Sequence, residues 1–250
     1  MDFMDVIIVA RMGSSRLPGK TLKKIGNNCM IEVLIKRLKY SKKIDRIILS
    51  TTLNKEDDEL YNWAKTKSID IFRGSSENVL QRIKKTADFF NINNFVFILG
   101  DNPLVDYRLV DYCIDTFLSS KNIDFLTTFS YEYNEYCNSK LFFPVGIRVQ
   151  ILSKCILDDI FSKVSDNYNQ EHSTSYIIQN INNYNVKFIE AAGKFSKSNL
   201  KNYNLAVNNI NQFNDVDLIF KFFDYRIDVD INSVVDYIKS RKEKFNNLKI

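Results

Sequence analysis

The sequence predicts an α/β fold, with three αβα layers around a mostly parallel, Rossmann-like sheet. Short apolar runs of β-type composition alternate with amphipathic helical patterns, which is typical of a sheet covered by helices on both faces. The 250 residues, 45% of them hydrophobic and 26% charged, suffice for one large domain with a buried core. No repeat, low-complexity tract or linker divides the sequence, so we assign residues 1–250 to a single domain.

The first half of the chain carries the clearest alternation. Apolar runs predict strands at 5–10, 46–51, 70–73, 95–99 and 124–128. Apolar residues at i, i+3, i+4 and i+7 predict a helix through Ile31, Leu34, Ile35 and Leu38. A second helical pattern begins near residue 79, and we expect Ser76 to be its N-cap.

The pattern changes after about residue 130. The segment 131–136 is aromatic and polar, and 141–152 is an extended stretch interrupted at Pro144 and Gly146. Amphipathic spacing predicts helices at 153–163, 172–181, 211–223 and 230–245. We therefore expect a small inserted subdomain at approximately 130–170, followed by helices that pack on the sheet.

Charge and composition exclude several classes of partner. The net charge of +5 is spread along the chain, and no basic run is typical of a nucleic-acid arm or a membrane patch. No apolar stretch approaches the roughly 18–20 residues of a membrane span, and no signal pattern begins the sequence. Cys29, Cys113, Cys137 and Cys155 lie far apart, as expected of reduced thiols in a cytoplasmic protein.

The loop after the first strand predicts an anion site. The strand stops at Ala10, and the next ten residues combine three cations with small residues. Small residues let backbone N–H groups approach an anion, while arginine forks onto phosphate oxygens. We expect a nucleotide phosphate chain here, bound by Ala10, Arg11, Met12, Gly13, Ser14, Arg16 and Lys20.

This loop has two other interpretations. Gly19-Lys20-Thr21 resembles the end of a Walker A loop, but five residues separate Gly13 from Gly19 where that loop has four. A solvated basic loop would explain the charge alone. It would not explain why small residues and cations coincide at the end of a strand, so the anion site is preferred.

Two further strand ends carry candidate ligands. Asp101 follows the strand 95–99 beside Gly100, and at the carboxyl edge of a parallel sheet its carboxylate would lie near the basic loop. It is the leading candidate to bind Mg²⁺, a cation that prefers oxygen ligands; an ordinary turn at Gly100–Pro103 is the alternative. The hydroxyls of Ser50 and Thr51 could contact a base or ribose, or cap the following helix.

The segment ARMGSSRLPGK resembles the signature loop of the cytidylyltransferases that make CMP-activated sugars, including CMP-sialic acid and CMP-Kdo synthetases. The likeness is greatest to the branch typified by the spore coat polysaccharide biosynthesis protein SpsF. Further segments match in the family's order: IILSTT, FRGSSENVLQR, LGDNPLVD, FPVG and EHSTSYI. The resemblance covers most of the chain and implies a nucleotide-diphospho-sugar transferase type of fold.

The resemblance also implies roles for individual residues. Arg11, Lys20 and Asp101 would be catalytic, with Asp101 binding Mg²⁺, and Arg73 and Gly100 would lie near the nucleotide. An acceptor site is implied at Pro144, Gly146, Arg148, Glu171 and His172. Read alone, Arg148 could be a surface residue, and a single histidine is more often structural than functional.

The sequence departs from the family at the second metal ligand. Asn208 stands where family members commonly carry an aspartate, and an amide oxygen brings no negative charge. The site could bind metal more weakly, recruit Asp215 or Asp217, use phosphates and water, or be degenerate.

The sequence as a whole indicates a Mg²⁺-dependent cytidylyltransferase that couples CTP to a sugar, sugar acid or related hydroxyl acceptor. A role in surface polysaccharide or glycan synthesis and a homodimer follow from the resemblance alone. The aromatic residues of the 130–150 region are compatible with a dimer interface. A nucleotide-sugar-dependent glycosyltransferase and a catalytically degenerate nucleotide-binding protein are the alternatives.

Overall fold

The computed structural model describes residues 3–120, 122–136 and 138–250, so Cys137 lies outside the described part. Its strands are β1 (Met4–Val9), β2 (Lys24–Ile25), β3 (Asn28–Cys29), β4 (Ile44–Thr52), β5 (Asp70–Gly74), β6 (Asn94–Leu99), β7 (Phe125–Thr128), β8 (Gln150–Ser153) and β9 (Val186–Ile189). Its α-helices are α1 (Met30–Leu38), α2 (Asp58–Thr66), α3 (Val79–Phe89), α4 (Tyr107–Ser119), α5 (Lys154–Lys163), α6 (Asn167–Glu171), α7 (Ser175–Gln179), α8 (Ile210–Phe222) and α9 (Ile231–Ser240).

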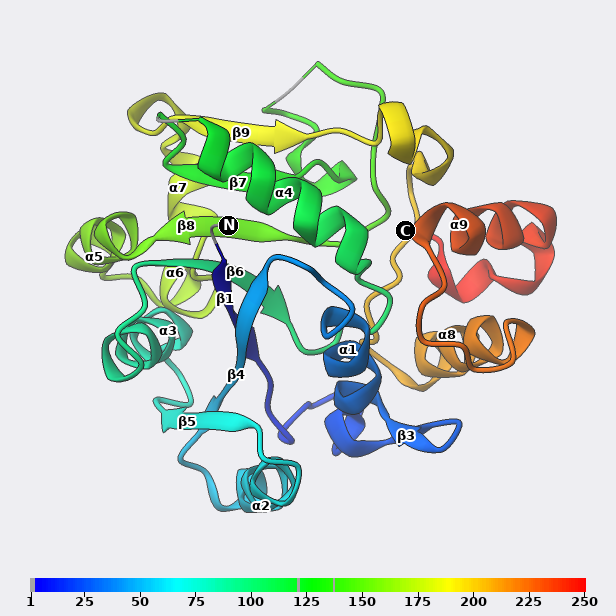
Figure 1. Cartoon of the computed structure of the whole chain (residues 1–250), viewed down its shortest axis with the longest axis horizontal. Helices are drawn as coiled ribbons and strands as arrows, with labels where there is room; N and C mark the ends of the chain where they lie inside the picture. The colour runs from blue at the N-terminus through cyan, green and yellow to red at the C-terminus, as the bar shows by residue number, and fades with distance from the viewer. Residues whose placement is uncertain (1–2, 121, 137) are drawn as a thin grey trace.

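Seven strands form one twisted sheet in the order β5-β4-β1-β6-β8-β7-β9 (Figure 1). Every neighbouring pair is parallel except those of β8, which runs antiparallel to both β6 and β7. The short strands β2 and β3 form a separate hairpin. Because β4, β1 and β6 are parallel, the loops that follow them leave at one edge of the sheet.

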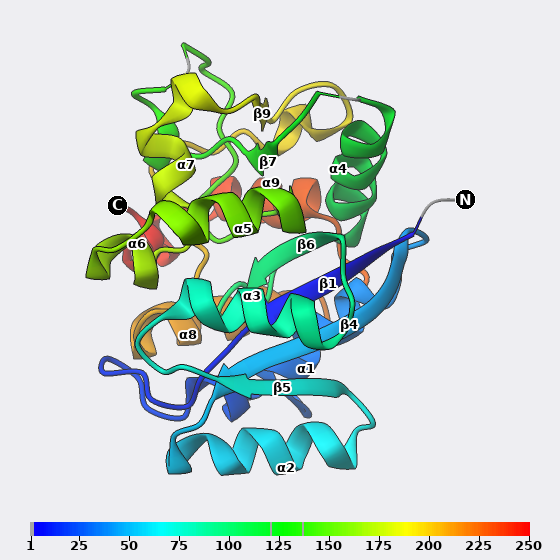
Figure 2. The same cartoon turned by 90° about the vertical axis from the view of Figure 1, so that its left-hand side faces the viewer.

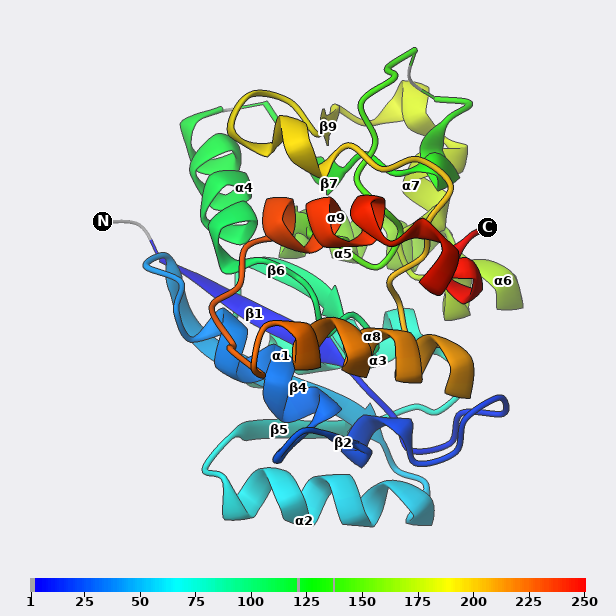
Figure 3. The same ribbon diagram turned by 90° about the vertical axis from the view of Figure 1, so that its right-hand side faces the viewer.

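The two faces of the sheet carry separate hydrophobic cores, as the alternation within β1 illustrates. Val6 and Ile8 pack into the core that includes residues of α1, α2, α4, α8 and α9, whereas Ile7 packs with α3, α5 and α7 on the opposite face. Figures 2 and 3 show these two helical layers from either side. The predicted three-layer αβα fold with a mostly parallel sheet is therefore confirmed.

The five predicted strands correspond to β1, β4, β5, β6 and β7, with ends shifted by one or two residues. The helix predicted at 172–181 is present only as the short α7 at Ser175–Gln179, because α6 ends at Glu171 and the chain is not helical between them. The backbone of His172 leaves helical geometry, and the Ser175 hydroxyl hydrogen-bonds to its carbonyl oxygen at 2.6 Å.

The N-cap of α3 also differs from the prediction. Asn78, not Ser76, begins the helix, because its side-chain oxygen accepts a hydrogen bond from the Gln81 N–H at 2.7 Å. The hydroxyl of Ser75 accepts in turn from the Asn78 N–H at 3.1 Å. The serine-rich turn therefore supports the capping residue.

The segment 130–170 is joined closely to the rest of the fold. Its strand β8 pairs with β6 and β7 in the middle of the main sheet, so that part is not an insertion set apart from it. Four of the aromatic residues expected at a dimer interface are buried within this chain, with Phe129 stacked on Phe142; these four are Phe129, Tyr133, Phe142 and Phe143. Only Tyr131 and Tyr136 of that group are exposed.

Within the described ranges, no helix is both long and apolar enough to cross a membrane. Cys29, Cys113 and Cys155 carry free thiols, as predicted for three of the four cysteines.

Candidate active site

Strands β1 and β6 bring together the basic loop, which follows β1, and the loop that carries Asp101, which follows β6. Val9 pairs with Leu99, so both strands end at the same level and Ala10 and Gly100 emerge side by side. The Gly100 N–H donates to the Val9 carbonyl oxygen at 2.8 Å, and a Cβ at position 100 would lie 2.7 Å from that of Ala10. Two small residues are thus required where the basic loop and Asp101 leave the sheet.

Lys20 links the basic loop to Asp101. Its ammonium Nζ lies 2.9 Å from Asp101 Oδ2 and 2.7 Å from the carbonyl oxygen of Val207. The Val207 N–H donates to the Asp101 carbonyl at 2.8 Å, which ties the segment before α8 to the same point. The other carboxylate oxygen, Asp101 Oδ1, is buried and has no hydrogen-bond partner among the described residues. A buried carboxylate oxygen without a partner is suited to a cation or to a donor from a ligand.

The basic loop is held by hydrogen bonds of its own backbone. The N–H groups of Ser14 and Gly19 both donate to the Met12 carbonyl at 2.9 Å, and Gly19 has a φ of 72°, which favours glycine. The Met12 N–H donates to Asp57 Oδ1 at 2.6 Å. Of the backbone N–H groups of residues 12–15, which were expected to approach a phosphate, those of Met12 and Ser14 thus already have protein acceptors in this structure.

Side chains of the loop instead line a cavity of about 290 Å³, which we call the basic cavity. Its cations outnumber its carboxylates, and the charged residues that line it are Arg11, Arg16, Lys20, Arg82, Asp101 and Glu171. Ala10, Ser14, Gly100, His172 and Asn208 line it as well. Five predicted residues of the basic loop thus meet Gly100, Asp101 and Asn208 in one cavity, and the charge of this cavity suits a polyphosphate.

Arg82 on α3 is a member of the basic cavity that sequence reasoning missed. Only 1% of the residue is exposed; one guanidinium nitrogen donates to the Ser75 carbonyl, and Nε has no hydrogen-bond partner in the described part of the chain. Burial lowers the pKa of Arg82 to about 10, and the nearby charge of Arg11 adds to this effect. Arg82 follows Val79 by three residues on α3, so both residues lie on the helix face that lines the cavity.

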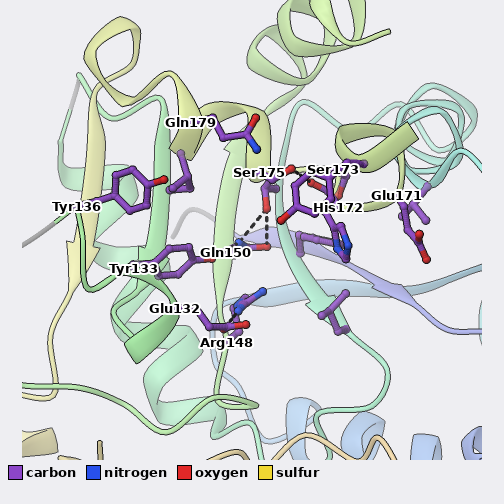
Figure 4. Close-up of a pocket in the computed structure, with 16 residues that line it drawn as sticks. Glu132, Tyr133, Tyr136, Arg148, Gln150, Glu171, His172, Ser173, Ser175 and Gln179 are labelled. Atoms are coloured by element: carbon purple, nitrogen blue, oxygen red, sulfur yellow. Dashed lines mark hydrogen bonds and ion pairs between the residues drawn. The ribbon is translucent and has the colours of Figure 1, made fainter. Parts of the chain in front are cut away.

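A second cavity of about 320 Å³, which we call the polar cavity, adjoins the first (Figure 4). Uncharged polar and aromatic side chains dominate it, among them Tyr133, Tyr136, Gln150 and Ser173, and Arg148 also lines it. Glu171 and His172 line both cavities. These two residues at the end of α6 therefore stand at the junction of the cavities.

Contacts on both sides position this junction. The Glu171 carboxylate lies 3.4 Å from the Arg11 guanidinium, and the His172 ring lies 4.6 Å, centroid to centroid, from that of Tyr168. Asp166 is the N-cap of the short helix α6, and its side chain accepts from the Asn169 N–H at 2.9 Å. The basic loop and α6 lie on the same side of the molecule in Figure 2.

Five predicted nucleotide-binding residues line neither cavity: Met12 and Gly13 of the basic loop, and Ser50, Thr51 and Arg73. Ser50 and Thr51 are fully buried in β4, and the Ser50 hydroxyl lies 2.8 Å from that of Thr86. The Arg73 guanidinium points toward the turn after β4, where it bonds the Thr52 carbonyl at 2.8 Å and the Asp58 carboxylate at 2.6 Å. In this structure, these side chains support the fold and do not contact the cavities.

Pro144 and Gly146 also lie outside the cavities, and their role here is to position backbone. Gly146 has a φ of 90°, and a Cβ there would lie 2.2 Å from the backbone nitrogen of Ala206. Val145 bridges Asn204 in the same place. The close approach fixes the segment that leads to Val207 and Asn208. Gly13 lines a neighbouring hollow, where its backbone approaches Glu56.

Asn208 reaches the basic cavity, but neither Asp215 nor Asp217 joins it there. Its Oδ1 accepts from the Arg16 guanidinium at 3.1 Å. Asp215 is buried against Asn247, burial raises its pKa, and Asp217 contacts Tyr225; neither aspartate lines the cavity. No group of three or more His, Cys, Asp or Glu side chains that could hold a metal occurs in the ranges the structure describes. The residues present thus offer one free carboxylate oxygen and an amide.

Comparisons with known proteins agree with this geometry. The profile of a family described as "Cytidylyltransferase" matches residues 6–244. The spore coat polysaccharide biosynthesis protein SpsF of Bacillus subtilis is 30% identical over 235 residues, covering 92% of this chain and 91% of that protein. A 3-deoxy-manno-octulosonate cytidylyltransferase of Fusobacterium nucleatum is 34% identical over 128 residues, about half of each chain. The solved structure of a cytidylyltransferase from Leptospira borgpetersenii matches with a TM-score of 0.87 and 26% identity, covering 100% of this chain and 99% of that one.

Proposed function

Since this chain belongs to the cytidylyltransferase family, we propose that it transfers CMP from CTP to a hydroxyl group of a sugar or related acceptor and releases pyrophosphate. The observation that carries the proposal is the pair of adjoining cavities, one cationic and one polar, with Glu171 and His172 lining both. A nucleotide in the first and a sugar in the second would meet at this junction.

The basic cavity is assigned to the triphosphate. The side chains of Arg11, Arg16, Lys20 and Arg82 surround it and would neutralise charge that develops on the leaving pyrophosphate. Arg82 is desolvated and incompletely hydrogen-bonded, so an anionic ligand would stabilise its charge. Fixed cations position both ends of the reacting phosphate for in-line displacement.

The junction is assigned to the attacking hydroxyl. His172 carries an imidazole, the side chain that most often serves as a general base in enzymes, so it is the side chain there best suited to accept the hydroxyl proton. Glu171 pairs with Arg11 and would hold this arginine in place at the junction of the two cavities. The acceptor hydroxyl would lose its proton to this base as its oxygen bonds to the α-phosphorus, while the bond to pyrophosphate breaks.

Mg²⁺ is the proposed cofactor, with Asp101 Oδ1 as its protein anchor and Asn208 as a weak second oxygen ligand. The free buried oxygen of Asp101 fits a divalent cation, and Mg²⁺ commonly takes one or two carboxylates and completes its shell with phosphates and water. When bound, the ion supplies positive charge and orientation to the phosphate oxygens.

The proposal is tested by measuring pyrophosphate release from CTP and Mg²⁺ with a panel of neutral sugars, sugar acids and sugar phosphates. Release that requires both CTP and an acceptor supports a cytidylyltransferase acting in glycan or surface polysaccharide synthesis. Release of a nucleoside diphosphate from a nucleotide sugar, with none of pyrophosphate from CTP, would indicate a glycosyltransferase instead.

Substitution Asn208→Asp is expected to strengthen Mg²⁺ binding in the presence of CTP by about tenfold, because it adds a second carboxylate to the site. The measurement is the Mg²⁺ concentration that gives half-maximal pyrophosphate release, compared with the wild type and with Asn209→Asp. Asn209 is the N-cap of α8, where aspartate caps equally well, so that variant controls for added charge nearby. An unchanged Mg²⁺ requirement in Asn208→Asp would show that position 208 does not contact the ion.

We also propose a homodimer that acts in the cytoplasm. The exposed Tyr131 and Tyr136 support an interface near the polar cavity, although the buried aromatic residues of that region do not contribute to it. Sedimentation velocity tests the assembly, and a monomer at micromolar concentration would contradict it.

A further inference from the structure

The turn between α6 and α7 supplies a continuous part of the cavity walls. Residues 171–175 all line the polar cavity, and Glu171 and His172 line the basic cavity as well. The chain is not helical from 172 to 174, and the backbone of His172 has a ψ of 63°. An unbroken helix would distribute five consecutive side chains around its circumference. The break is therefore what lets all five face the cavities.

Asn169 is a buried residue on α6 whose side chain fixes this turn. Only 6% of it is exposed, and it lines neither cavity. Its amide Nδ2 donates to Asp166 Oδ2 at 2.9 Å and to Gln179 Oε1 at 3.1 Å. Its Oδ1 accepts from the Ser175 hydroxyl at 2.5 Å, and the same hydroxyl lies 2.6 Å from the His172 carbonyl oxygen. One amide group thus joins the start of α6 to both ends of α7.

The directions of these hydrogen bonds require an amide at position 169. The two partners of Nδ2 are acceptors, whereas the partner of Oδ1 is a hydroxyl that donates. Asparagine offers two donors and an acceptor in the space of an aspartate, which offers acceptors alone when ionised. Hydrogen bonds from Asn169 also hold the pKa of the Asp166 carboxyl below its usual range. Asp166 is therefore ionised at neutral pH, and its hydrogen bond to the amide is charge-assisted.

A second contact holds the other side of the turn against the sheet. Gln150 is buried in β8, and its Nε2 donates to Thr174 Oγ1 at 3.1 Å. Figure 4 shows Gln150, His172 and Ser175 around the same cavity. The turn thus has fixed points on both sides, one in the sheet and one in the interior of α6 and α7.

We propose that Asn169 is a positioning residue for the transfer reaction, which holds Glu171 and His172 at the junction of the cavities. This inference rests on the proposed function, because it takes His172 as the base that receives the acceptor proton. A misplacement of about 1 Å costs about a hundredfold in rate, so kcat depends on the geometry of the turn. The cations assigned to the triphosphate lie on the basic loop and on α3, so CTP binding depends on the turn much less.

The test reverses one hydrogen bond of Asn169. Asn169→Asp keeps the size of the side chain but removes both donors and places a second carboxylate against Asp166. In the double variant Asp166→Asn/Asn169→Asp, the amide introduced at position 166 donates to the carboxylate at position 169 and caps α6 equally well. The Gln179 amide can turn over and donate to the same carboxylate. Asn167→Asp is the matched control, since it makes the same chemical change at an exposed position of α6.

The first readout is the NMR spectrum of the histidine. The chain has one histidine, so the imidazole signals of tag-free protein labelled with ¹³C-histidine belong to His172. The whole protein is measured alone and with CTP and Mg²⁺. The His172 ring lies 4.6 Å from the Tyr168 ring, so a nuclear Overhauser effect should join them, and its loss in Tyr168→Leu assigns it.

We expect the wild type and Asn167→Asp to show the same His172 signals and the same Overhauser effect to Tyr168. In Asn169→Asp the signals should shift and the effect should fall to less than a third, and the double variant should restore both. Wild-type signals in Asn169→Asp, or no recovery in the double variant, would overturn the proposal. If Asn169→Asp does not fold, Ser175→Ala removes only the hydroxyl between α6 and α7, and unchanged His172 signals in that variant would overturn the proposal too.

The second readout is the rate of pyrophosphate release with CTP, Mg²⁺ and the best acceptor of the panel. In Asn169→Asp, kcat should fall about a hundredfold while the KM for CTP stays within threefold of the wild-type value. The double variant should recover kcat to within about fivefold. A purely structural role would instead lower the amount of folded enzyme and leave the His172 signals of the folded fraction unchanged, which contradicts the proposal.

The two readouts also separate this inference from the proposed function. A wild type that neither binds CTP nor releases pyrophosphate contradicts the proposed transfer reaction, even where the His172 signals change in Asn169→Asp as expected. An active wild type whose kcat is unchanged in Asn169→Asp keeps the proposed function and overturns only the positioning role.

Discussion

Replacing Asp101 with asparagine is expected to lower pyrophosphate release from CTP by about a thousandfold, equivalent to roughly 4 kcal/mol in the activation free energy. The substitution keeps the size of the side chain and removes the only carboxylate that follows β6 into the basic cavity. Lys20 keeps its second acceptor, the Val207 carbonyl at 2.7 Å, so the loop should remain in place. The loss should therefore come from the missing metal anchor.

A binding measurement separates this role from a structural one. Without divalent cations, Asp101→Asn should bind CTP at least as tightly as the wild type, because a negative charge near the triphosphate is removed. With Mg²⁺ added, the wild type should gain affinity and the variant should not. Calorimetric titration of CTP with and without Mg²⁺ provides both numbers.

Asp236→Asn is the matched control, since Asp236 is exposed on α9 and lies 3.9 Å from Lys197. It should leave activity and CTP binding unchanged. If Asp101→Asn retained more than about a tenth of the wild-type activity, or lost CTP binding in the absence of metal, the assignment of Asp101 as metal anchor would be wrong.

Local sequence patterns were sufficient to predict the central strands and the basic loop. Strand β1 is buried on both faces and therefore has a nearly continuous apolar sequence. The basic loop that follows it is rich in cations and small residues, so the end of the strand is clear from composition. Strand β9 was missed and β8 was expected only as the end of the extended stretch 141–152, because the pairing of both strands depends on partners far away in the chain. The break at His172 was missed because it depends on hydrogen bonds of polar side chains, which leave no periodic signal.

The candidate site was predicted where it depends on strand ends and missed where it depends on side-chain direction. Asp101 and Lys20 meet because β1 and β6 are adjacent parallel strands, a consequence of the predicted fold. Ser50 and Thr51 also end a strand, but their hydroxyls point into the protein. Only the packing of α3 against β4 brings Thr86 to Ser50 and Arg82 to the cavity, and a sequence pattern does not contain that packing.

Arg37 stabilises the fold through contacts that the sequence pattern also does not show. Arg37 lies on the amphipathic helix α1, where a charged residue is expected on the face toward solvent. The structure buries it completely. Its guanidinium donates to four backbone carbonyls, those of Leu104, Val105, Ile227 and Val229, at 3.3, 3.0, 2.6 and 2.9 Å. Two of these belong to the loop after Asp101 and two to the connection between α8 and α9. Arg37 therefore joins segments that are more than a hundred residues apart.

Substitution Arg37→Met is expected to lower the free energy of unfolding by about 4 kcal/mol, because four buried carbonyls lose their donor and nearby Asp106 loses a compensating charge. For a domain of this size that corresponds to a fall of about 10 °C in Tm. Burial lowers the pKa of Arg37 only to about 10, so the wild-type side chain is charged at neutral pH and both effects apply.

Arg37→Lys separates the loss of charge from the loss of geometry. Lysine keeps the charge but offers three N–H donors on one nitrogen in place of the five spread over the guanidinium, so it cannot satisfy all four carbonyls and roughly half of the loss should remain. The matched control Arg241→Met removes an exposed arginine and should change stability by less than about 0.5 kcal/mol. Urea denaturation and thermal melts of the three variants provide the comparison. A loss below about 1 kcal/mol in Arg37→Met would mean that water satisfies these carbonyls, and that the loop carrying Asp101 does not depend on Arg37 for its position.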